Sequence, residues 1–165
     1  MRAATVEELH DFDEVIDVRS PGEFTEDHVP GAINLPVLTD AERERVGTMY
    51  KQVSSFEAKK VGAALVSRNI AQYLEGYLAD KPKSYRPLVY CWRGGSRSGA
   101  MTHILQKIGF GAMQLDGGYK AYRRHVVAEL SCLPARLSYR VVCGPTGSGK
   151  SRLLQVLESE GAQVL

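Results

Sequence analysis

The sequence contains no apolar run long enough to cross a membrane, since no stretch approaches the roughly 20 apolar residues that a spanning helix needs. The N-terminal residues also lack the apolar core of a secretory signal and become acidic at Glu7 and Glu8. Cysteine is scarce, and an odd number of widely spaced thiols, Cys91, Cys132 and Cys143, does not suggest a disulfide framework. We therefore expect a cytoplasmic protein without a membrane segment, whose cysteines are core residues or reactive thiols.

The charges of the chain are unevenly distributed, although the formal net charge is only +2. Residues 1–80 carry 15 acidic and 8 basic side chains, whereas residues 81–140 carry 2 acidic and 11 basic ones. A segment this basic suits a polyanionic partner such as RNA or a phosphorylated substrate, and a solvated basic face explains the charge equally well. The candidates for phosphate contacts are Arg86, Lys107, Lys120, Arg123, Arg124, Arg136 and Arg140.

Short apolar segments alternate with helical patterns over the first part of the chain. Strands are expected at 14–18, 32–35, 88–90 and 112–115. Helices are expected to begin at Ser20 and Ser54, each of which is followed three residues later by Glu, and further helices at 98–108 and 119–130. This alternation predicts an α/β domain with a parallel sheet. The helix after Ser54 should direct one face into the core, formed by Val66, Ile70, Tyr73, Leu74 and Tyr77.

The length of 165 residues allows one domain and part of a second. We expect the first domain at 1–130, a linker with Pro134 at 131–138, and the start of a second domain at 139–165. In the last segment, a strand at 139–143 with a buried and unreactive Cys143 should precede a helix and the start of another strand. Such a piece leaves strand edges and an apolar helix face uncovered, so we expect it to be mobile or to lean on the first domain.

The loop after the strand at 88–90 is the main candidate for a reactive site. Cys91 lies at the carboxyl end of a strand and before a helix, where ligands bind in open α/β sheets. Two glycines allow several backbone N–H groups to point inward, and these groups, the helix dipole and Arg97 would favour a thiolate at Cys91. The same groups would hold a persulfide, a perselenide or an oxyanion. The loop consists of Cys91, Trp92, Arg93, Gly94, Gly95, Ser96, Arg97 and Ser98.

A buried, inert cysteine is the alternative interpretation of Cys91, but such a cysteine needs neither two glycines nor an arginine in C-x5-R spacing. Trp92 and Arg93 either contact substrate or shape the loop, and the sequence does not decide between the two.

Five segments in order resemble the signatures of a rhodanese domain: Asp-Val-Arg at 17–19, Ser-Pro-Gly-Glu-Phe at 20–24, His-Val-Pro-Gly-Ala-Ile-Asn-Leu-Pro at 28–36, the Cys91 loop, and Leu-Asp-Gly-Gly-Tyr at 115–119. The resemblance implies a parallel sheet flanked by helices and a persulfide-forming Cys91. The loop is C-x5-R, one residue longer than the common sulfurtransferase loop and equal to that of related dual-specificity phosphatases. It therefore leaves room for a phosphate or a selenium species.

Residues 144–151 match the phosphate-binding pattern G-x-x-x-x-G-K-[ST] at every fixed position. The backbone N–H groups and Lys150 would hold phosphate oxygens, and Ser151 could bind Mg²⁺. No acidic strand of the Walker B type follows, so we expect only the first strand, loop and helix of a P-loop domain, and no other metal site or cofactor. The residues of this glycine-rich loop expected to bind phosphate are Gly144, Gly147, Gly149, Lys150 and Ser151.

Together with the segments 47–52 and 54–60, the cysteine loop and the glycine-rich loop resemble the tRNA 2-selenouridine synthase family. The resemblance implies a transferase that uses selenophosphate to replace sulfur by selenium on the wobble 2-thiouridine of tRNA, and that also geranylates that sulfur from geranyl diphosphate. It implies Cys91 as the nucleophile and Arg97 with the loop amides as anion binders. The chain resembles only the first part of such a protein, so we do not expect it to complete the reaction alone.

Three other functions agree with the same residues. They are a plain rhodanese sulfurtransferase with an unrelated ATPase segment, a non-catalytic RNA- or phosphate-binding module, and a phosphatase. For the phosphatase a general acid is missing from the assignment, because nothing in the sequence brings Asp116 within reach of Cys91. The sequence does not indicate an oligomeric state.

Overall fold

The computed structural model describes residues 3–136, 138 and 140–164. The chain divides into two compact units, Met1–Glu129 and Leu130–Leu165, and each is described by itself. Within the described residues, no helix is both long enough and apolar enough to cross a membrane.

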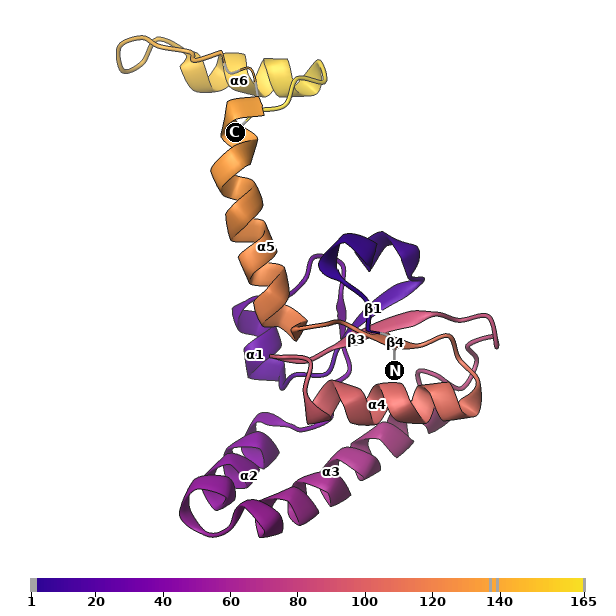
Figure 1. The fold of residues 1–165 in the computed structure, drawn as a ribbon. Coiled ribbons are helices and arrows are strands. Elements are labelled where there is room, and N and C mark those ends of the chain that lie inside the picture. The colour runs from indigo at the N-terminus through magenta and orange to yellow at the C-terminus, as the bar shows by residue number, and fades with distance from the viewer. Residues whose placement is uncertain (1–2, 137, 139, 165) are drawn as a thin grey trace. The chain divides into compact units, whose positions relative to one another are not determined.

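The first unit is built on a parallel four-stranded sheet with the strand order β2-β1-β3-β4 (Figure 1). The strands are short: β1 is Glu14–Asp17, β2 is Ile33–Asn34, β3 is Pro87–Tyr90 and β4 is Met113–Gln114. An isolated parallel bridge between Ala4 and Leu115 adds to the β4 edge. The expected fold class, a parallel sheet flanked by helices, is confirmed, with the strands close to the positions that the apolar segments predict.

Both faces of the sheet are covered, because successive residues of a strand point to opposite sides. On one face, Ile16 and Val89 lie in a core cluster with residues of α3 (Ser55–Glu75) and α4 (Ser96–Ile108). On the other face, Leu88 and Tyr90 lie in a second cluster with residues from three further helices. These are the 3₁₀ helix η1 (Val6–Asp11), α1 (Pro21–Glu26) and the start of α5 (Gly118–Cys132).

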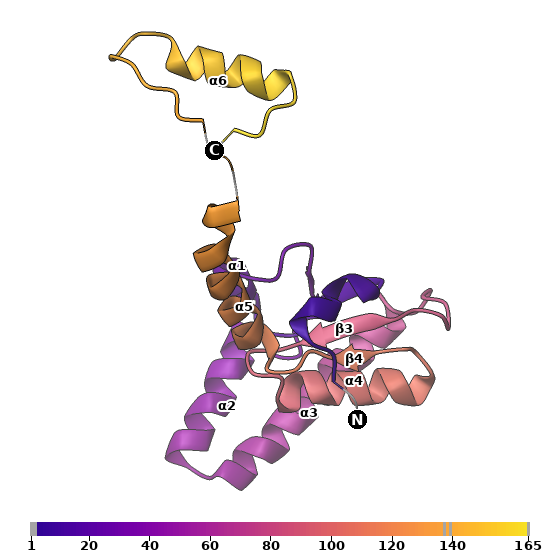
Figure 2. The same ribbon diagram turned by 45° about the horizontal axis from the view of Figure 1, so that its top comes forward.

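A helical hairpin follows the second strand. α2 (Asp40–Gln52) and α3 lie side by side in both views of the ribbon (Figures 1 and 2). The Ser54 hydroxyl accepts hydrogen bonds from the backbone N–H groups of Phe56 and Glu57, which confirms Ser54 as the N-cap of α3.

The core face of α3 forms as expected for four of its five side chains. Val66 and Ile70 are buried, and Tyr73 and Leu74 pack partly buried against the same cluster. The expectation for Tyr77 is wrong: α3 ends at Glu75, and Tyr77 is 44% exposed. Because Tyr77 no longer follows the helical repeat, its ring stays at the surface, and its hydroxyl donates to Glu14 at 2.6 Å.

The second unit contains two helical segments among its described residues, η2 (Leu133–Arg136) and α6 (Lys150–Ser159), in addition to the end of α5. The linker expected at 131–138 is therefore helical up to Arg136. The helix expected after the glycine-rich loop is present, and its Leu153, Val156 and Leu157 are exposed.

The strands expected at 139–143 and 162–165 are not found at 140–143 and 162–164, while Tyr139 and Leu165 lie outside the described residues. A strand is stable only when a neighbouring strand pairs with its backbone, and the described part of this unit provides none. Cys143 is exposed, so its assignment as a buried thiol is wrong for the same reason.

Candidate active site

Cys91 follows the last residue of β3 and lies at the N-terminal end of α4, as the sequence predicts. It is buried, with 3% of its surface exposed. Its carbonyl oxygen accepts a hydrogen bond from the backbone N–H of Tyr119 at 2.9 Å, and that of Trp92 accepts one from Lys120 at 3.0 Å. The first turn of α5 is thus bonded directly to the cysteine loop.

This close approach requires glycine at position 118. Gly118 has φ +58°, and a Cβ atom there would lie 2.2 Å from the Cys91 carbonyl oxygen and 2.5 Å from the Gly94 nitrogen. Gly94, with φ +65°, is restricted in the same way by the carbonyl oxygen of Leu115, at 2.8 Å from its hypothetical Cβ. Two glycines from distant parts of the sequence therefore allow the loop and the start of α5 to pack backbone against backbone.

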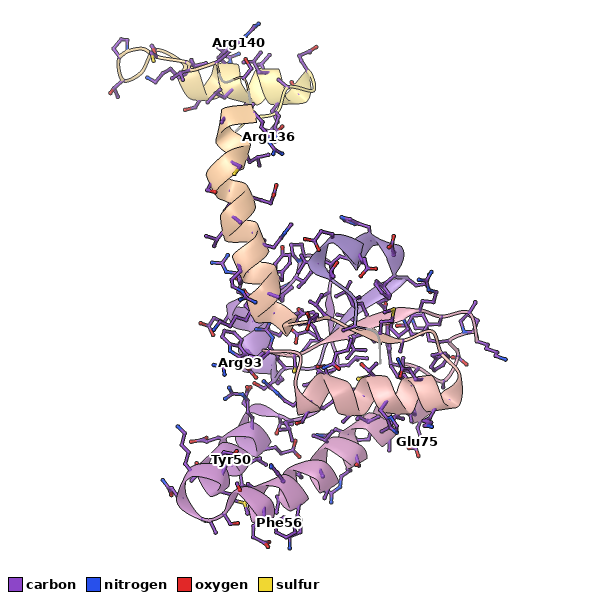
Figure 3. The ribbon with its side chains drawn as sticks, in the orientation of Figure 1. Tyr50, Phe56, Glu75, Arg93, Arg136 and Arg140 are labelled. Atoms are coloured by element: carbon purple, nitrogen blue, oxygen red, sulfur yellow. The ribbon has the colours of Figure 1, made fainter. Side chains whose placement is uncertain are left out.

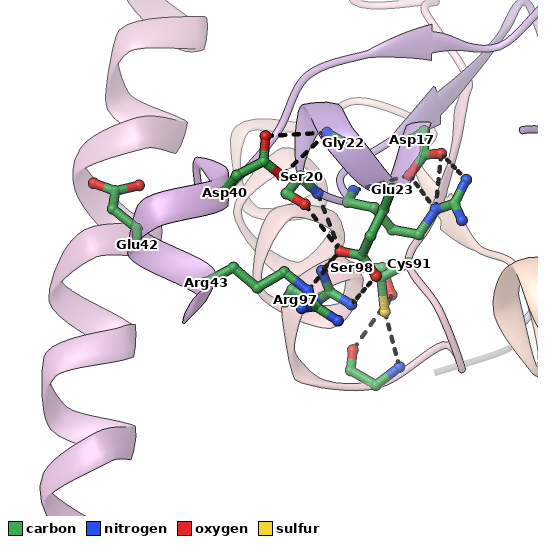
Figure 4. A network of polar contacts seen from close by, with 12 residues as sticks. Asp17, Ser20, Gly22, Glu23, Asp40, Glu42, Arg43, Cys91, Arg97 and Ser98 are labelled. Carbon is green, nitrogen blue, oxygen red and sulfur yellow. Dashed lines mark hydrogen bonds and ion pairs between the residues drawn. The ribbon is translucent and has the colours of Figure 1, made fainter. Parts of the chain in front are cut away.

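The Cys91 sulfur accepts two hydrogen bonds. The backbone N–H of Gly95 lies 3.3 Å from Sγ, and the hydroxyl of Ser98 lies 3.1 Å from it (Figure 4). Both donors belong to the loop or to the first turn of α4, so the helix dipole acts in the same direction. Donors at these positions stabilise a negative charge on sulfur, or on an atom bound to it.

Gln114, at the end of β4, determines how the Ser98 hydroxyl is oriented. Its amide nitrogen lies 2.6 Å from the Gly94 carbonyl oxygen and 3.2 Å from that of Gly95, and carbonyl oxygens only accept. The same nitrogen donates to Ser98 Oγ at 2.9 Å. Because Ser98 Oγ is an acceptor for Gln114, its own proton points at an acceptor, which is the Cys91 sulfur at 3.1 Å or the Gly95 carbonyl oxygen at 3.3 Å.

Arg97 contacts a carboxylate that is 74 positions away in the sequence. Its guanidinium donates to Glu23, with Nη1 2.7 Å from Oε2 and Nη2 3.4 Å from Oε1. Arg43, from α2, approaches the same Oε2 with its Nε at 2.8 Å (Figure 4). Burial of Glu23 raises its pKa, but the bonds and charges of Arg97 and Arg43 outweigh this, so the pKa lies below the ordinary value.

Two arginines therefore share one carboxylate beside the cysteine loop, and the group keeps a formal positive charge of one. None of the hydrogen bonds found in the described residues joins Arg97 to the Cys91 sulfur. The role of Arg97 as an anion binder stays a prediction. In that role, its guanidinium would have to bind a ligand anion in addition to Glu23.

A third arginine, Arg19, is enclosed beside the loop. Arg19 is 1% exposed and forms an ion pair with the buried Asp17 at 2.7 Å. Its guanidinium lies over the ring of Tyr119 at 4.1 Å and over that of Trp92 at 5.9 Å. Burial and a hydrogen bond to Asp27 raise the pKa of Tyr119 to about 12, so its hydroxyl stays protonated at neutral pH.

Three other loop side chains are exposed at the surface. Trp92 is 41% exposed, Arg93 and Ser96 are exposed, and Figure 3 labels Arg93 beside the loop. Their exposure leaves them accessible to a ligand, and whether they contact one stays a prediction.

Sequence reasoning missed Gln114 and treated Glu23 only as a capping residue. The one signal in the sequence that could have indicated Gln114 is its polar side chain within the apolar segment 112–115, which ends at the Asp-Gly-Gly turn.

The glycine-rich loop of the second unit is folded around its own lysine. Lys150 Nζ donates to the carbonyl oxygens of Gly144 and Pro145, each at 2.8 Å, and Gly147 and Gly149 have φ near +80°. α6 begins at Lys150, two residues before the expected helix at 152–160, and no strand precedes the loop among the described residues 140–143. No group of three His, Cys, Asp or Glu side chains suited to a metal ion occurs among the described residues. Phosphate and Mg²⁺ binding here stay predictions.

The parallel sheet and the cysteine loop between a strand and a helix define a rhodanese-type domain. The chain belongs to this family, since the model of the rhodanese-like domain matches residues 2–125.

Among curated proteins, the chain is similar to enzymes named tRNA 2-selenouridine synthase. It is 41% identical to that of Nitrosomonas europaea over 85% of this chain, and 43% identical to that of Shewanella denitrificans over 86% of it. It covers only 37% and 39% of the length of these two relatives.

Among solved structures, the chain is similar to the N-terminal domain of a "putative ATP/GTP binding protein" from Clostridium difficile 630, with 39% identity and a TM-score of 0.66. The match covers 76% of this chain and 99% of that one.

Proposed function

We propose that this chain provides the rhodanese-type part of a tRNA 2-selenouridine synthase, and that Cys91 is its nucleophile. The observation that carries the proposal is the pair of donors, Gly95 N–H and the Ser98 hydroxyl, directed at a buried sulfur at the end of β3. The similarity to enzymes of that name supports the substrate class. Since the chain covers about two-fifths of their length, the activity of the whole protein is part of the proposal.

In this proposal, the substrates are tRNA with 2-thiouridine at the wobble position, selenophosphate as the selenium donor, and geranyl diphosphate for geranylation of the same sulfur. Each brings an anion to the cysteine loop. The N-terminal turn of α4 and the positive charge of the Arg97–Glu23–Arg43 group would hold phosphate oxygens there. The glycine-rich loop, with Lys150 and Ser151, would take a further phosphate or diphosphate.

The tRNA partner fits the charge distribution of the chain. The basic side chains concentrate between residues 81 and 140, on both sides of the cysteine loop in sequence. Among the candidates, Lys120, Arg123, Arg124 and Arg136 lie on α5 and η2. Phosphate contacts of this kind fix the position of the RNA, and the loop would then meet the modified base.

A plain sulfurtransferase is the second candidate, and membership of the rhodanese family favours it. In that reaction, the Cys91 thiolate attacks the outer sulfur of thiosulfate. The sulfur–sulfur bond of thiosulfate breaks, sulfite leaves, and Cys91 becomes a persulfide. The donors on Sγ would then hold the charge of the persulfide.

The two candidates are separated by parallel assays on the wild-type chain, Cys91→Ser and the control Cys132→Ser, whose thiol is exposed and remote in sequence. Selenium transfer is measured by mass spectrometry of nucleosides from thiouridine RNA supplied with selenophosphate, and sulfur transfer by thiocyanate formation from thiosulfate and cyanide. Binding of the RNA is measured in the same mixture, because we do not expect the chain alone to complete the reaction. Sulfur transfer that depends on Cys91, without preference for thiouridine RNA over unmodified RNA, would favour the plain sulfurtransferase. Activity that survives Cys91→Ser would refute both.

A further inference from the structure

The indole of Trp92, which directly follows Cys91, is an open aromatic surface in the cysteine loop. It is 41% exposed, and its ring contacts are with buried side chains. The ring of Tyr119, 4% exposed, lies 5.6 Å away, and the guanidinium of Arg19, 1% exposed, lies 5.9 Å away. Because both partners are buried, the exposed surface of the indole faces solvent. A second planar ring can stack on such a surface.

The indole is also held in place before any ligand arrives. The Trp92 carbonyl oxygen accepts a hydrogen bond from the backbone N–H of Lys120 at 3.0 Å, so the start of α5 fixes the backbone of the loop. The hydroxyl of Tyr119 donates to Asp27, which fixes the ring on which the indole rests. A side chain that is already ordered loses little conformational entropy when it binds a partner.

Unpaired positive charge surrounds this indole. Arg93, Lys120 and Arg124 are exposed, and none of them forms an ion pair within the part of the chain that the structure describes. Lys120 and Arg124 are four residues apart on α5 and therefore share a face of that helix. Residues 91–125 contain one carboxylate, Asp116. An aromatic ring between cations is typical of a surface that binds a single nucleic-acid strand.

The side chains of Cys91 and Trp92 leave the loop in different directions. The Cys91 sulfur accepts hydrogen bonds from Gly95 and Ser98 and belongs to the core cluster that α4 covers. The indole instead contacts Tyr119, which belongs to the cluster on the other face of the sheet. Two side chains that diverge from consecutive positions suit two successive nucleotides better than a single base.

We propose that Trp92 stacks on a nucleobase of single-stranded RNA, and that this base is an immediate neighbour of the thiouridine at Cys91. The inference rests on the proposed function for the RNA, and on the geometry of the loop for the place. Stacking accepts any base, because every base has a π face, so Trp92 positions the strand without selecting its sequence. Arg93, Lys120 and Arg124 would bind phosphates on either side of the stacked base.

The first test is the binding of an end-labelled RNA stem-loop, with 2-thiouridine in its loop, to the 165-residue chain, measured by fluorescence anisotropy. Trp92→Leu should weaken binding roughly five- to 150-fold, which corresponds to the loss of one base–aromatic stack. Trp92→Phe keeps a ring and should stay within about threefold of the wild type. The matched control is Phe56→Leu, a 65% exposed aromatic position at the start of α3, which should bind like the wild type. Equal losses in Trp92→Leu and Trp92→Phe, or no loss in either, would overturn the proposal.

Abasic sites in the RNA identify the stacked nucleotide. Removing the base 5′ or the base 3′ of thiouridine should, for one of the two, weaken binding to the wild type as much as Trp92→Leu does. The same abasic site should weaken binding to Trp92→Leu no further, because the stack is already lost. Abasic sites elsewhere in the RNA loop should affect the two proteins alike, which a misfolded variant would not show. Coupling of Trp92 to the thiouridine itself, or to neither neighbour, would refute the assignment.

The salt dependence separates stacking from phosphate contacts. Stacking releases no counterions, so the slope of log affinity against log salt should be the same for Trp92→Leu and the wild type. Arg124→Gln should reduce the size of that slope by roughly 0.7, the value for one contact to a single strand. A smaller slope in Trp92→Leu would show that this change disturbs phosphate contacts, and would count against the stack.

The result can be told apart from that of the selenium assay. Coupling between Trp92 and a neighbouring base, without selenium transfer that depends on Cys91, would count against the proposed function and leave the stack standing. Selenium transfer that Trp92→Leu leaves unchanged at limiting RNA would overturn the stack alone. Absence of any RNA binding at low salt would overturn both.

Discussion

Glu23→Gln should destabilise the first unit by about 2 kcal/mol at neutral pH. The carboxylate pairs with Arg97, and the two side chains are only 15% and 20% exposed. A hydrogen bond to a charged partner contributes about 1.5–3 kcal/mol. The pair with Arg43, which is 50% exposed, adds less than about 1 kcal/mol. Glutamine keeps one acceptor, so part of the bonding survives. For a domain of this size, the loss corresponds to a melting temperature about 6–10 °C lower.

The pH dependence identifies the cause. The folded-state pKa of Glu23 is depressed below 4.5. The stabilisation by the carboxylate is therefore fully present above pH 4.5 and is lost as the pH falls through the folded-state pKa. Urea denaturation of the wild type and of Glu23→Gln at pH 7, 5, 4 and 3 should show a difference in unfolding free energy that is constant down to about pH 5 and then shrinks. A difference that stays the same at pH 3 would refute the argument, since it would arise from packing and not from charge.

Three further outcomes are expected. Gly118→Ala should destabilise the first unit by more than about 3 kcal/mol in thermal unfolding, because its Cβ would lie 2.2 Å from the Cys91 carbonyl oxygen. The control Gly47→Ala, which has open space around its Cβ, should be neutral or stabilising, and equal effects of the two changes would contradict the packing argument. Ser98→Ala and Gln114→Leu should both slow the alkylation of Cys91 by roughly three- to tenfold, as measured by mass spectrometry of the Cys91 peptide. An unchanged rate in Gln114→Leu would show that the Gln114 amide does not orient the Ser98 hydroxyl. Binding of thiouridine tRNA, measured by filter retention, should weaken with salt at a log–log slope of roughly −0.7 to −0.9 per phosphate contact, and a salt-independent affinity would exclude the basic segment as the binding surface.

Local patterns predicted the elements and the position of the cysteine. The strand at 14–18, the capping box of Ser20 with Glu23, and the loop between β3 and α4 depend on neighbouring residues, so they can be derived from the sequence. The two glycines of the loop indicated that backbone N–H groups point inward, and the Gly95 N–H does donate to the Cys91 sulfur. They did not indicate that Gly118 packs against Gly94.

Long-range pairs could not be derived in the same way. Glu23 and Arg97 are 74 positions apart, and Gln114 reaches Ser98 across 16, so each contact depends on how the strands are ordered in the sheet. The apolar pocket between α2, α3 and the first turns of α4 depends on how three helices pack, which no periodic pattern in the sequence reveals. The prediction of strands after residue 138 was wrong for residues 140–143 and 162–164, because an apolar, β-branched segment forms a strand only when another strand pairs with it.

The position of Trp92 gives this protein an optical reporter of its own. It is the single tryptophan of the sequence, and it follows Cys91 directly. Its indole is 41% exposed, lies 5.6 Å from the ring of Tyr119 and faces the Arg19 guanidinium. Emission excited at the red edge of the absorption band therefore comes from the cysteine loop alone. Quenching or a spectral shift on addition of a ligand then reports occupancy of this loop without any label, and unfolding of the first unit can be followed without a contribution from residues 130–165.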